Sequence, residues 1–175
     1  MKNDACGIGV AYDAKISGIR ILSGEITEAD EAAALNYKYQ ENQIYSCSWG
    51  PPDLGEVAEG PQGIILDAIR NGIENGRQGK GSIFVFASGN GGHNDDNCNF
   101  DGYTNSIYTI TVGAIDRLGN YPSYAEKCAA QFFVTYSSGS GNHIVTKMIW
   151  IESRLYLCLF FLFLVYNRRS FKPMF

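Results

Sequence analysis

A short and almost wholly apolar run, Ser82–Ala87 (Ser-Ile-Phe-Val-Phe-Ala), restricts the choice of fold more than any other part of this sequence. An apolar run of this length without alternation is typical of a strand that is buried on both faces, as strands are in parallel sheets. A helical stripe of apolar residues comes before it, and a loop rich in Gly, Asn and Asp follows over 88–105. This order predicts an α/β domain.

The rest of the chain continues the alternation of strands and helices. Further strands are predicted over 15–22, 43–49, 107–114 and 132–136. One helix is expected from an N-cap at Thr27 to about Lys38, and another from Pro61 to Gly76. In a parallel sheet the chemistry lies in loops at the carboxyl ends of the strands. The informative loops are therefore 49–60 and 88–105.

Charge and composition exclude some functions. The chain has 175 residues, which suggests one domain, and its net charge of −4 argues against a general nucleic-acid binder. It contains only two histidines, His93 and His143, so a site built from three histidines is impossible. A bound metal would be a hard cation such as calcium, held by carboxylates and carbonyls.

The end of the chain differs from the body. All 20 glycines lie at or before Gly141, and the apolar run 155–166 is flanked by charged residues. That run is shorter than the roughly 20 residues needed to span a bilayer, although a membrane anchor stays an alternative. The N-terminus shows no signal-peptide pattern. We predict a domain over 3–146 and an unrelated hydrophobic and basic tail over 147–175.

The five cysteines form no zinc or redox motif, and their odd number indicates a free thiol or a missing partner. Cys98 and Cys128 lie in turn-rich loops, where a disulfide could form in an oxidising compartment. Composition alone leaves the pairing open.

Several long motifs carry a family resemblance. They are Ser48-Trp49-Gly50-Pro51, the stretches 87–92 and 98–108, the opening 3–12 and Thr135-Tyr136-Ser137-Ser138-Gly139. In this order they resemble the kexin/furin-like proprotein convertases, which are subtilisin-fold serine endoproteases, and fungal kexins are the most similar. The resemblance covers about 3–146. It implies an α/β fold with a subtilisin-like parallel sheet flanked by helices and truncated at both ends. It also implies a calcium-dependent endopeptidase that cleaves after paired basic residues.

The resemblance assigns roles to particular residues. Asn90 corresponds to the side chain that donates to the oxyanion of the tetrahedral intermediate. Asp53 and Asp101 would line the S1 pocket for a P1 arginine, because a guanidinium is best bound by carboxylates. Ser48, Trp49, Gly50 and Pro51 would form one wall of S1, whereas Glu31 and Glu59 match acidic positions near S4.

The same resemblance implies two calcium sites and a disulfide. One site would use Asp53, Asp96 and Glu126, and the other would use Asn3, Ala5 and Gly7, with its remaining ligands upstream. Cys98 and Cys128 match a disulfide of the family. Each lone loop carboxylate could equally be a solvated surface charge.

The family pattern also has gaps in this chain. The triad Asp and His of the family precede the stretch matched by Cys6-Gly7-Ile8-Gly9, and the triad Ser follows residue 147. His93, His143, Ser137, Ser138 and Ser140 do not match triad positions, and Pro52 and Leu54 replace residues that are often acidic. The chain alone is therefore expected to be inactive.

Partners and compartment follow from the resemblance too. The expected partners are proteins or peptides with Lys-Arg or Arg-Arg sites, without nucleic acid, in the secretory pathway (late Golgi or cell surface). A membrane contact would use the tail or a missing anchor. The alternatives are a non-catalytic fragment or binding module, and a short membrane-anchored product.

Overall fold

The computed structural model describes residue 11, residues 13–22 and 24–141, and the backbone of short strands at 150–151, 154–155 and 171–173. Its elements in chain order are α1 (Glu28–Leu35), β1 (Ile44–Cys47), α2 (Gly63–Gly79), β2 (Ile83–Ala87), the 3-10 helix η1 (Gly91–Asn94), β3 (Thr109–Ile115), β4 (Gln131–Tyr136), β5 (Trp150–Ile151), β6 (Arg154–Leu155) and β7 (Phe171–Pro173). The main sheet has the strand order β4-β3-β2-β1-β7, and every neighbouring pair in it is parallel. This confirms the predicted α/β class.

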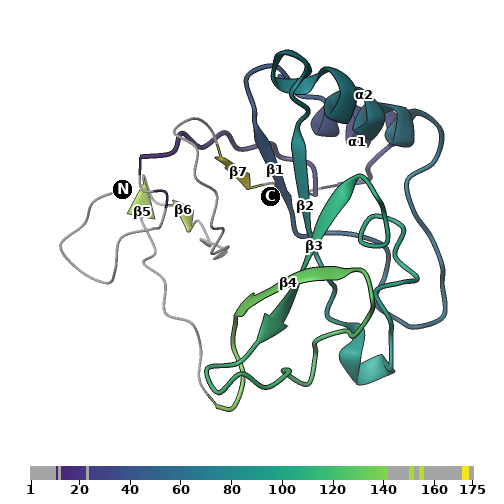
Figure 1. Ribbon diagram of the computed structural model, residues 1–175, viewed down its shortest axis with the longest axis vertical. Helices are drawn as coiled ribbons and strands as arrows, with labels where there is room; N and C mark the ends of the chain where they lie inside the picture. Colours follow the sequence, from purple (N-terminus) through teal and green to yellow (C-terminus); the bar gives the residue numbers. More distant parts are fainter. Residues whose placement is uncertain are drawn as a thin grey trace.

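The two helices lie next to each other on one side of the sheet (Figure 1). The core on that side combines Tyr45 and Cys47 of β1 and Phe84 and Phe86 of β2 with apolar residues of the helices. Residues one position along, such as Ile44 and Val85, form a smaller cluster on the opposite face. Burial on both faces explains why the run Ser82–Ala87 is almost wholly apolar.

Helix α1 begins as the sequence predicts. The Thr27 side chain accepts from the backbone N–H of Asp30, and the Asp30 carboxylate accepts from the backbone N–H of Thr27, both at 3.2 Å. The helix ends at Leu35 rather than near Lys38. Asn36 donates from its side chain to Ala68 O at 2.6 Å instead of continuing the helix.

Helix α2 loses helical geometry at Gly76, as predicted, because Gly76 has a ψ of 153° and Arg77 is left-handed with a φ of 51°. The strand predicted over 15–22 is wrong. Only Ile16 and Ile19 take part in isolated β-bridges there. Ile19 and Ile21 pack against the core that includes residues of α1. Gly18 interrupts the alternation in this segment and offers no side chain to pack on a sheet.

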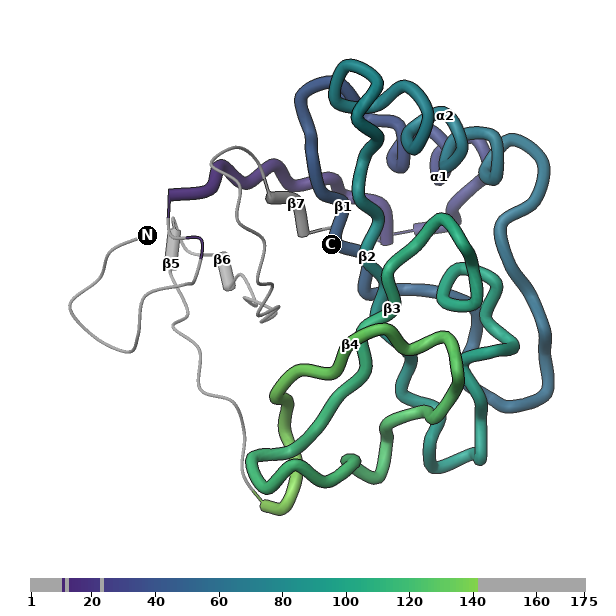
Figure 2. Tube along the Cα trace, viewed as in Figure 1, coloured from purple at the N-terminus to yellow at the C-terminus, as the bar shows by residue number. Residues whose placement is uncertain are grey.

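The chain trace in Figure 2 shows how the carboxyl ends of the strands connect to the long loops. The loop after β1 and the loop after β2 both return toward the same edge of the sheet. They are joined at Glu59 and Asp101, which form a parallel bridge in which Gly102 N donates to Glu59 O at 2.7 Å. The two loops that the sequence marks as informative are therefore in direct contact.

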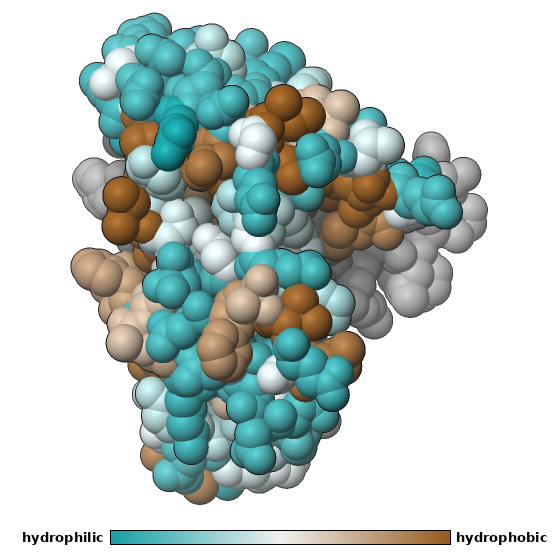
Figure 3. All heavy atoms as spheres, turned by 90° about the vertical axis from the view of Figure 1, so that its right-hand side faces the viewer, coloured by the Kyte–Doolittle hydropathy of each residue, from teal (hydrophilic) through white to brown (hydrophobic). Residues whose placement is uncertain are grey.

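The surface on the helix side is mostly hydrophilic over its upper part, and apolar groups gather across its middle (Figure 3). Among strands β1 to β4, strand β4 has the most exposed apolar side chains, with Phe132 exposed by 72% and Tyr136 by 57%. In the part of the chain that the structure describes, no helix is long and apolar enough to cross a membrane.

Candidate functional site

A cavity of about 530 Å³ lies where strands β1 to β4 end. It is lined by Ser48, Trp49, Gly50, Pro51, Pro52, Asp53, Ala87, Ser88, Gly89, Asn90, Asp101, Val112, Gly113, Ala114, Tyr124, Thr135, Tyr136 and Ser137. The residues predicted for S1 and for the oxyanion donor are therefore together in one cavity. Parallel strands explain the convergence, because all their carboxyl ends meet at one edge of the sheet.

The wall formed by Ser48–Pro51 follows β1 directly and is held by aromatic packing. The Trp49 ring lies edge-on to Phe86 of β2, with centroids 5.5 Å apart, and edge-on to Tyr103, at 5.2 Å. Edge-to-face pairs of this kind stabilise beyond the area that they bury. The wall is thus fixed to the sheet on one side and to the 98–105 loop on the other.

Asp101, one acid of the predicted S1 pair, is half-buried and held by backbone groups. Its Oδ1 accepts from the backbone N–H of Tyr103 at 2.7 Å and of Thr104 at 3.4 Å. Its Oδ2 lies so close to Gly50 that a Cβ there would be 2.9 Å away. Burial raises the pKa of Asp101 to about 6, against the lowering effect of these two hydrogen bonds, and the nearby Asp53 and Asp96 carboxylates raise it further.

No cationic side chain in the described part of the chain forms an ion pair with Asp101. A desolvated carboxylate without a counter-ion is costly, and a bound cation would relieve that cost. The electrostatics of the cavity therefore favour a positively charged ligand.

Asp53 also belongs to a cluster of three carboxyl groups beside this cavity. Asp53, Asp96 and Glu126 each offer one oxygen, and these oxygens lie within 4.8 Å of one another. Backbone N–H groups orient them: Asn90 donates to Asp53 Oδ2 at 2.8 Å, Gly91 to Glu126 Oε1 at 2.9 Å, and Asn97 to Asp96 Oδ1 at 2.7 Å. The cluster thus depends on the turn that runs from the end of β2 through η1.

Glu126 is buried, and its pKa is raised to about 7 by desolvation and by the nearby carboxylates, although the hydrogen bond from Gly91 lowers it. Oxygen ligands with a high negative charge suit Ca²⁺, and this donor set fits that ion. The predicted metal ligands Asp53, Asp96 and Glu126 are brought together. The other predicted set, Asn3, Ala5 and Gly7, lies outside the described residues.

Asn90 follows β2 in the turn to η1 and is exposed at the edge of the cavity. Its backbone is fixed by the hydrogen bond to Asp53. A side-chain amide held at the mouth of a pocket is a suitable donor to a developing oxyanion.

The predicted S4 acids line a neighbouring pocket of about 320 Å³. Glu31 of α1 and Glu59 both face it, and the segment Trp49–Pro52 separates it from the larger cavity. The Tyr103 hydroxyl donates to Glu31 Oε1. Burial raises the pKa of Glu31, and the hydrogen bond from Tyr103 partly opposes this rise. The structure therefore places both acids in one acidic pocket.

A disulfide joins Cys98 and Cys128, with their Cα atoms 5.4 Å apart, which is the pairing that the resemblance implies. It ties the 98–105 loop to the segment before β4. Cys47 of β1 is fully buried in the core. His93 is exposed, with its Nε2 3.3 Å from Ser123 Oγ, and it does not line the cavity.

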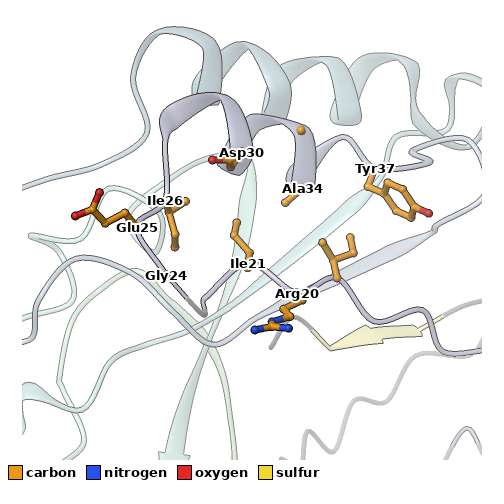
Figure 4. Close-up of a pocket in the computed structure, with 10 residues that line it drawn as sticks. Arg20, Ile21, Gly24, Glu25, Ile26, Asp30, Ala34 and Tyr37 are labelled. Carbon is orange, nitrogen blue, oxygen red and sulfur yellow. The ribbon is translucent and has the colours of Figure 1, made fainter.

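Several cavity residues were not predicted. The cavity is also lined by Tyr124, Val112, Gly113 and Ala114, and by Thr135, Tyr136 and Ser137, which the sequence marks only as part of a motif or turn. They come from β3, from β4 and the residue after it, and from the loop between these strands, so only the strand order reveals them. A separate hollow of about 380 Å³ lies beside α1, lined by Ile21, Ile26, Ala34 and Tyr37 among others (Figure 4).

The sequence of this chain matches those of known proteins. Residues 1–152 match the model of the subtilase family. The chain is 62% identical to a kexin of Candida albicans over 149 residues, covering 85% of this chain and 16% of that protein. It is 61% identical to a dibasic-processing endoprotease of Yarrowia lipolytica over 145 residues, covering 83% of this chain and 15% of that protein. A human proprotein convertase subtilisin/kexin type 7 is 56% identical over 137 residues, covering 78% and 18%. The chain thus spans less than a fifth of the length of these relatives.

Proposed function

Because this chain belongs to the subtilase family and is a kexin/furin-like part of it, we propose that it supplies the substrate-binding side of an endopeptidase that cleaves proteins after paired basic residues. We place its subtilase part at 3–146 and treat 147–175 as a segment apart from it.

The observation that carries this proposal is the pair of carboxylates, Asp53 and Asp101, at one cavity beside the wall Ser48–Pro51. A P1 arginine has a planar guanidinium with several N–H donors, which bind best to fixed carboxylate oxygens. Asp101 is held in place by two backbone N–H groups and lacks a cationic partner in the described chain. The cavity therefore has the shape and charge to bind an arginine side chain.

The pocket of Glu31 and Glu59 gives the second element of specificity. It lies on the other side of the Trp49–Pro52 segment, so a peptide crossing this segment would present side chains to both pockets. Acidic groups there attract basic residues upstream of P1. The natural substrates are accordingly proteins with basic residues before the cleaved bond.

Calcium would be held by Asp53, Asp96 and Glu126, where it would neutralise the clustered charge and fix the turn of Asn90. Asp53 is shared between the cluster and the cavity, so the ion would also fix one wall of S1. This role is structural, because the ion would add no step to peptide hydrolysis.

Asn90 would donate its side-chain amide to the oxyanion that forms when the peptide carbonyl is attacked. The nucleophile and the general base are expected from segments other than the described residues, since the Ser123–His93 contact lies outside the cavity. The chain of 175 residues is therefore proposed to bind basic peptides without cleaving them. Its disulfide and its kexin-like relatives favour a place in the secretory pathway.

Fluorescence of Trp49 tests the proposal, because this residue lines both pockets. The chain contains two tryptophans, so a Trp150→Phe background isolates the Trp49 signal. Acetyl-Lys-Arg-amide should change the emission saturably in the presence of calcium and bind more weakly after chelation. Acetyl-Lys-Ala-amide should bind at least tenfold more weakly, and mass spectrometry of a longer dibasic peptide should show no cleavage.

Asp101→Asn in the same background should remove most of the affinity for the Lys-Arg peptide. Asp95→Asn changes an exposed acid of the neighbouring loop and should leave the affinity unchanged. Equal affinity for the two peptides, or an Asp101→Asn chain that binds as the parent does, would contradict the proposal.

A further inference from the structure

We propose that Tyr124 is a positioning residue that sets the separation of two walls of the arginine cavity, and thereby the preference for arginine over lysine. This inference rests on the proposed function, since it concerns the same cavity. Tyr124 lies in the loop between β3 and β4 and lines that cavity.

Tyr124 connects two segments that follow different strands. Its backbone oxygen accepts from the N–H of Gly92, in η1, at 2.9 Å. Its hydroxyl donates to Ser138 O at 3.0 Å and shares a hydrogen bond of 2.7 Å with the Ser137 hydroxyl, just beyond the end of β4. One residue therefore links the turn of Asn90 to the wall formed by Thr135–Ser137.

Other contacts hold the segment after β4 at each end. Ser137 N donates to Ile115 O at 2.7 Å, which continues the pairing of β3 and β4. Farther along, Ser140 Oγ donates to the buried Asp116 carboxylate. Between these two points, the Tyr124 hydroxyl holds the segment by both a side-chain and a main-chain oxygen.

The same loop also carries the acid cluster. Ala125 N donates to Pro122 O at 3.0 Å, and Glu126, two residues after Tyr124, places its carboxylate in the cluster. The backbone contact of Tyr124 with Gly92 and the carboxylate contact of Glu126 with Gly91 lie side by side on η1. The backbone of Tyr124 is thus held against η1. Its side chain reaches across the end of the cavity, where the hydroxyl contacts the segment after β4.

This arrangement has a consequence for selectivity. The walls after β1 and after β4 lie at opposite ends of the four-strand edge, because the strand order is β4-β3-β2-β1. A guanidinium needs acceptors at a set spacing in one plane, whereas an ammonium is a compact charge that tolerates a looser site. Loss of the Tyr124 contacts would let the segment after β4 move. This should weaken the binding of an arginine side chain more than that of a lysine side chain.

The test compares Tyr124→Phe with Tyr121→Phe in the Trp150→Phe background. Tyr121 lies on the same loop, is 51% exposed and does not line the cavity, so its variant should behave as the parent. Trp49 fluorescence, with calorimetry, gives the Kd of agmatine as the guanidinium probe and of cadaverine as the ammonium probe. Loss of two hydrogen bonds is expected to weaken agmatine binding about tenfold. Cadaverine binding should change about twofold, so that the Kd ratio itself shifts.

The ratio separates positioning from simple loss of folded protein, which would weaken both probes equally. If Tyr124→Phe does not fold, Ser137→Ala removes only the side-chain hydroxyl and should shift the ratio in the same direction. An unchanged ratio in a folded Tyr124→Phe or Ser137→Ala chain overturns the inference. A parent chain that binds neither probe overturns the proposed function instead.

Discussion

The backbone N–H of Asn90 donates to Asp53 Oδ2 across 2.8 Å, although the two residues are 37 positions apart in the chain. This bond ties the loop after β1 to the loop after β2 at the edge of the cavity. It joins the candidate oxyanion donor to an acid that takes part in both the S1 pair and the acidic cluster. Substrate binding, ion binding and catalysis would therefore depend on one small group of contacts.

The cluster of Asp53, Asp96 and Glu126 predicts that calcium raises the melting temperature of the chain, and that one substitution removes this effect. Asp96→Asn deletes one charged ligand and should abolish the rise in melting temperature that calcium gives to the parent chain. The stabilisation expected for the parent is about 2.7 kcal/mol at a calcium concentration of 100 times Kd. Scanning calorimetry with calcium and with chelator measures it. The control is Asp95→Asn at the adjacent exposed position, and a full calcium shift in Asp96→Asn would exclude the cluster as the site.

The raised pKa values predict a pH dependence of stability in the absence of calcium. Burial raises the pKa of Asp101 from 3.8 to about 6 and that of Glu126 from 4.5 to about 7. The folded state therefore keeps protons that the unfolded state releases, so this contribution is full below about pH 4 and is lost as the pH rises through 6 and 7.

Glu126→Gln removes one of the two groups and isolates its share. The difference in free energy of unfolding between parent and variant, from urea titrations with chelator at pH 4 to 8, should move in favour of the variant as the pH rises. A difference that does not vary with pH would show that Glu126 is not perturbed. Calcium should reverse the trend, because it binds the deprotonated carboxylate.

Asn90→Ala tests the oxyanion role in the longest natural form of the protein that shows peptidase activity. Removal of one oxyanion donor costs about 10²–10³ in kcat, a range measured for the oxyanion-hole asparagine of subtilisin. KM for a dibasic fluorogenic peptide should change little, since the donor acts on the transition state. A kcat within threefold of the parent would rule out this role.

Gly60→Ala probes the contact between the two loops. A Cβ at Gly60 would lie 2.6 Å from Gly102 Cα, so the loops would have to separate next to the Glu59–Asp101 bridge. We expect a loss of about 1–3 kcal/mol in stability and weaker binding of the Lys-Arg peptide. Gly18→Ala meets nothing within 4 Å and serves as the matched control in urea unfolding. Parent-like affinity in Gly60→Ala would mean that the contact does not position Asp101.

Reduction of the Cys98–Cys128 disulfide should destabilise the chain, because the bond closes a loop of 30 residues. The expected cost is about 3–4 kcal/mol in free energy of unfolding, measured by urea titration with and without reductant. Cys98→Ala should give the same loss without reductant, and reductant should not add to it. A midpoint that reductant leaves unchanged in the parent would contradict a stabilising disulfide.

Local patterns were enough to predict much of this fold. The apolar run of β2, the capping pair Thr27 and Asp30, and the break at Gly76 each depend on residues that are close in sequence. The strand prediction for 15–22 was wrong. Alternation of apolar and polar residues alone cannot distinguish a strand from an irregular segment whose isoleucines pack against the core. The motifs around Trp49, Asn90 and Asp101 indicated the family and the candidate residues.

The sequence by itself therefore determined the α/β class, the loops that carry chemistry and the acids that belong to them. Only the tertiary structure decided which of those acids meet. Strand order placed Asp53, Asp96 and Glu126 within 4.8 Å of one another and brought Glu31 of α1 to the pocket of Glu59. It also placed the Tyr124 hydroxyl on the segment after β4. These contacts join residues far apart along the chain, so they follow from how the strands pair and pack, which no local pattern encodes.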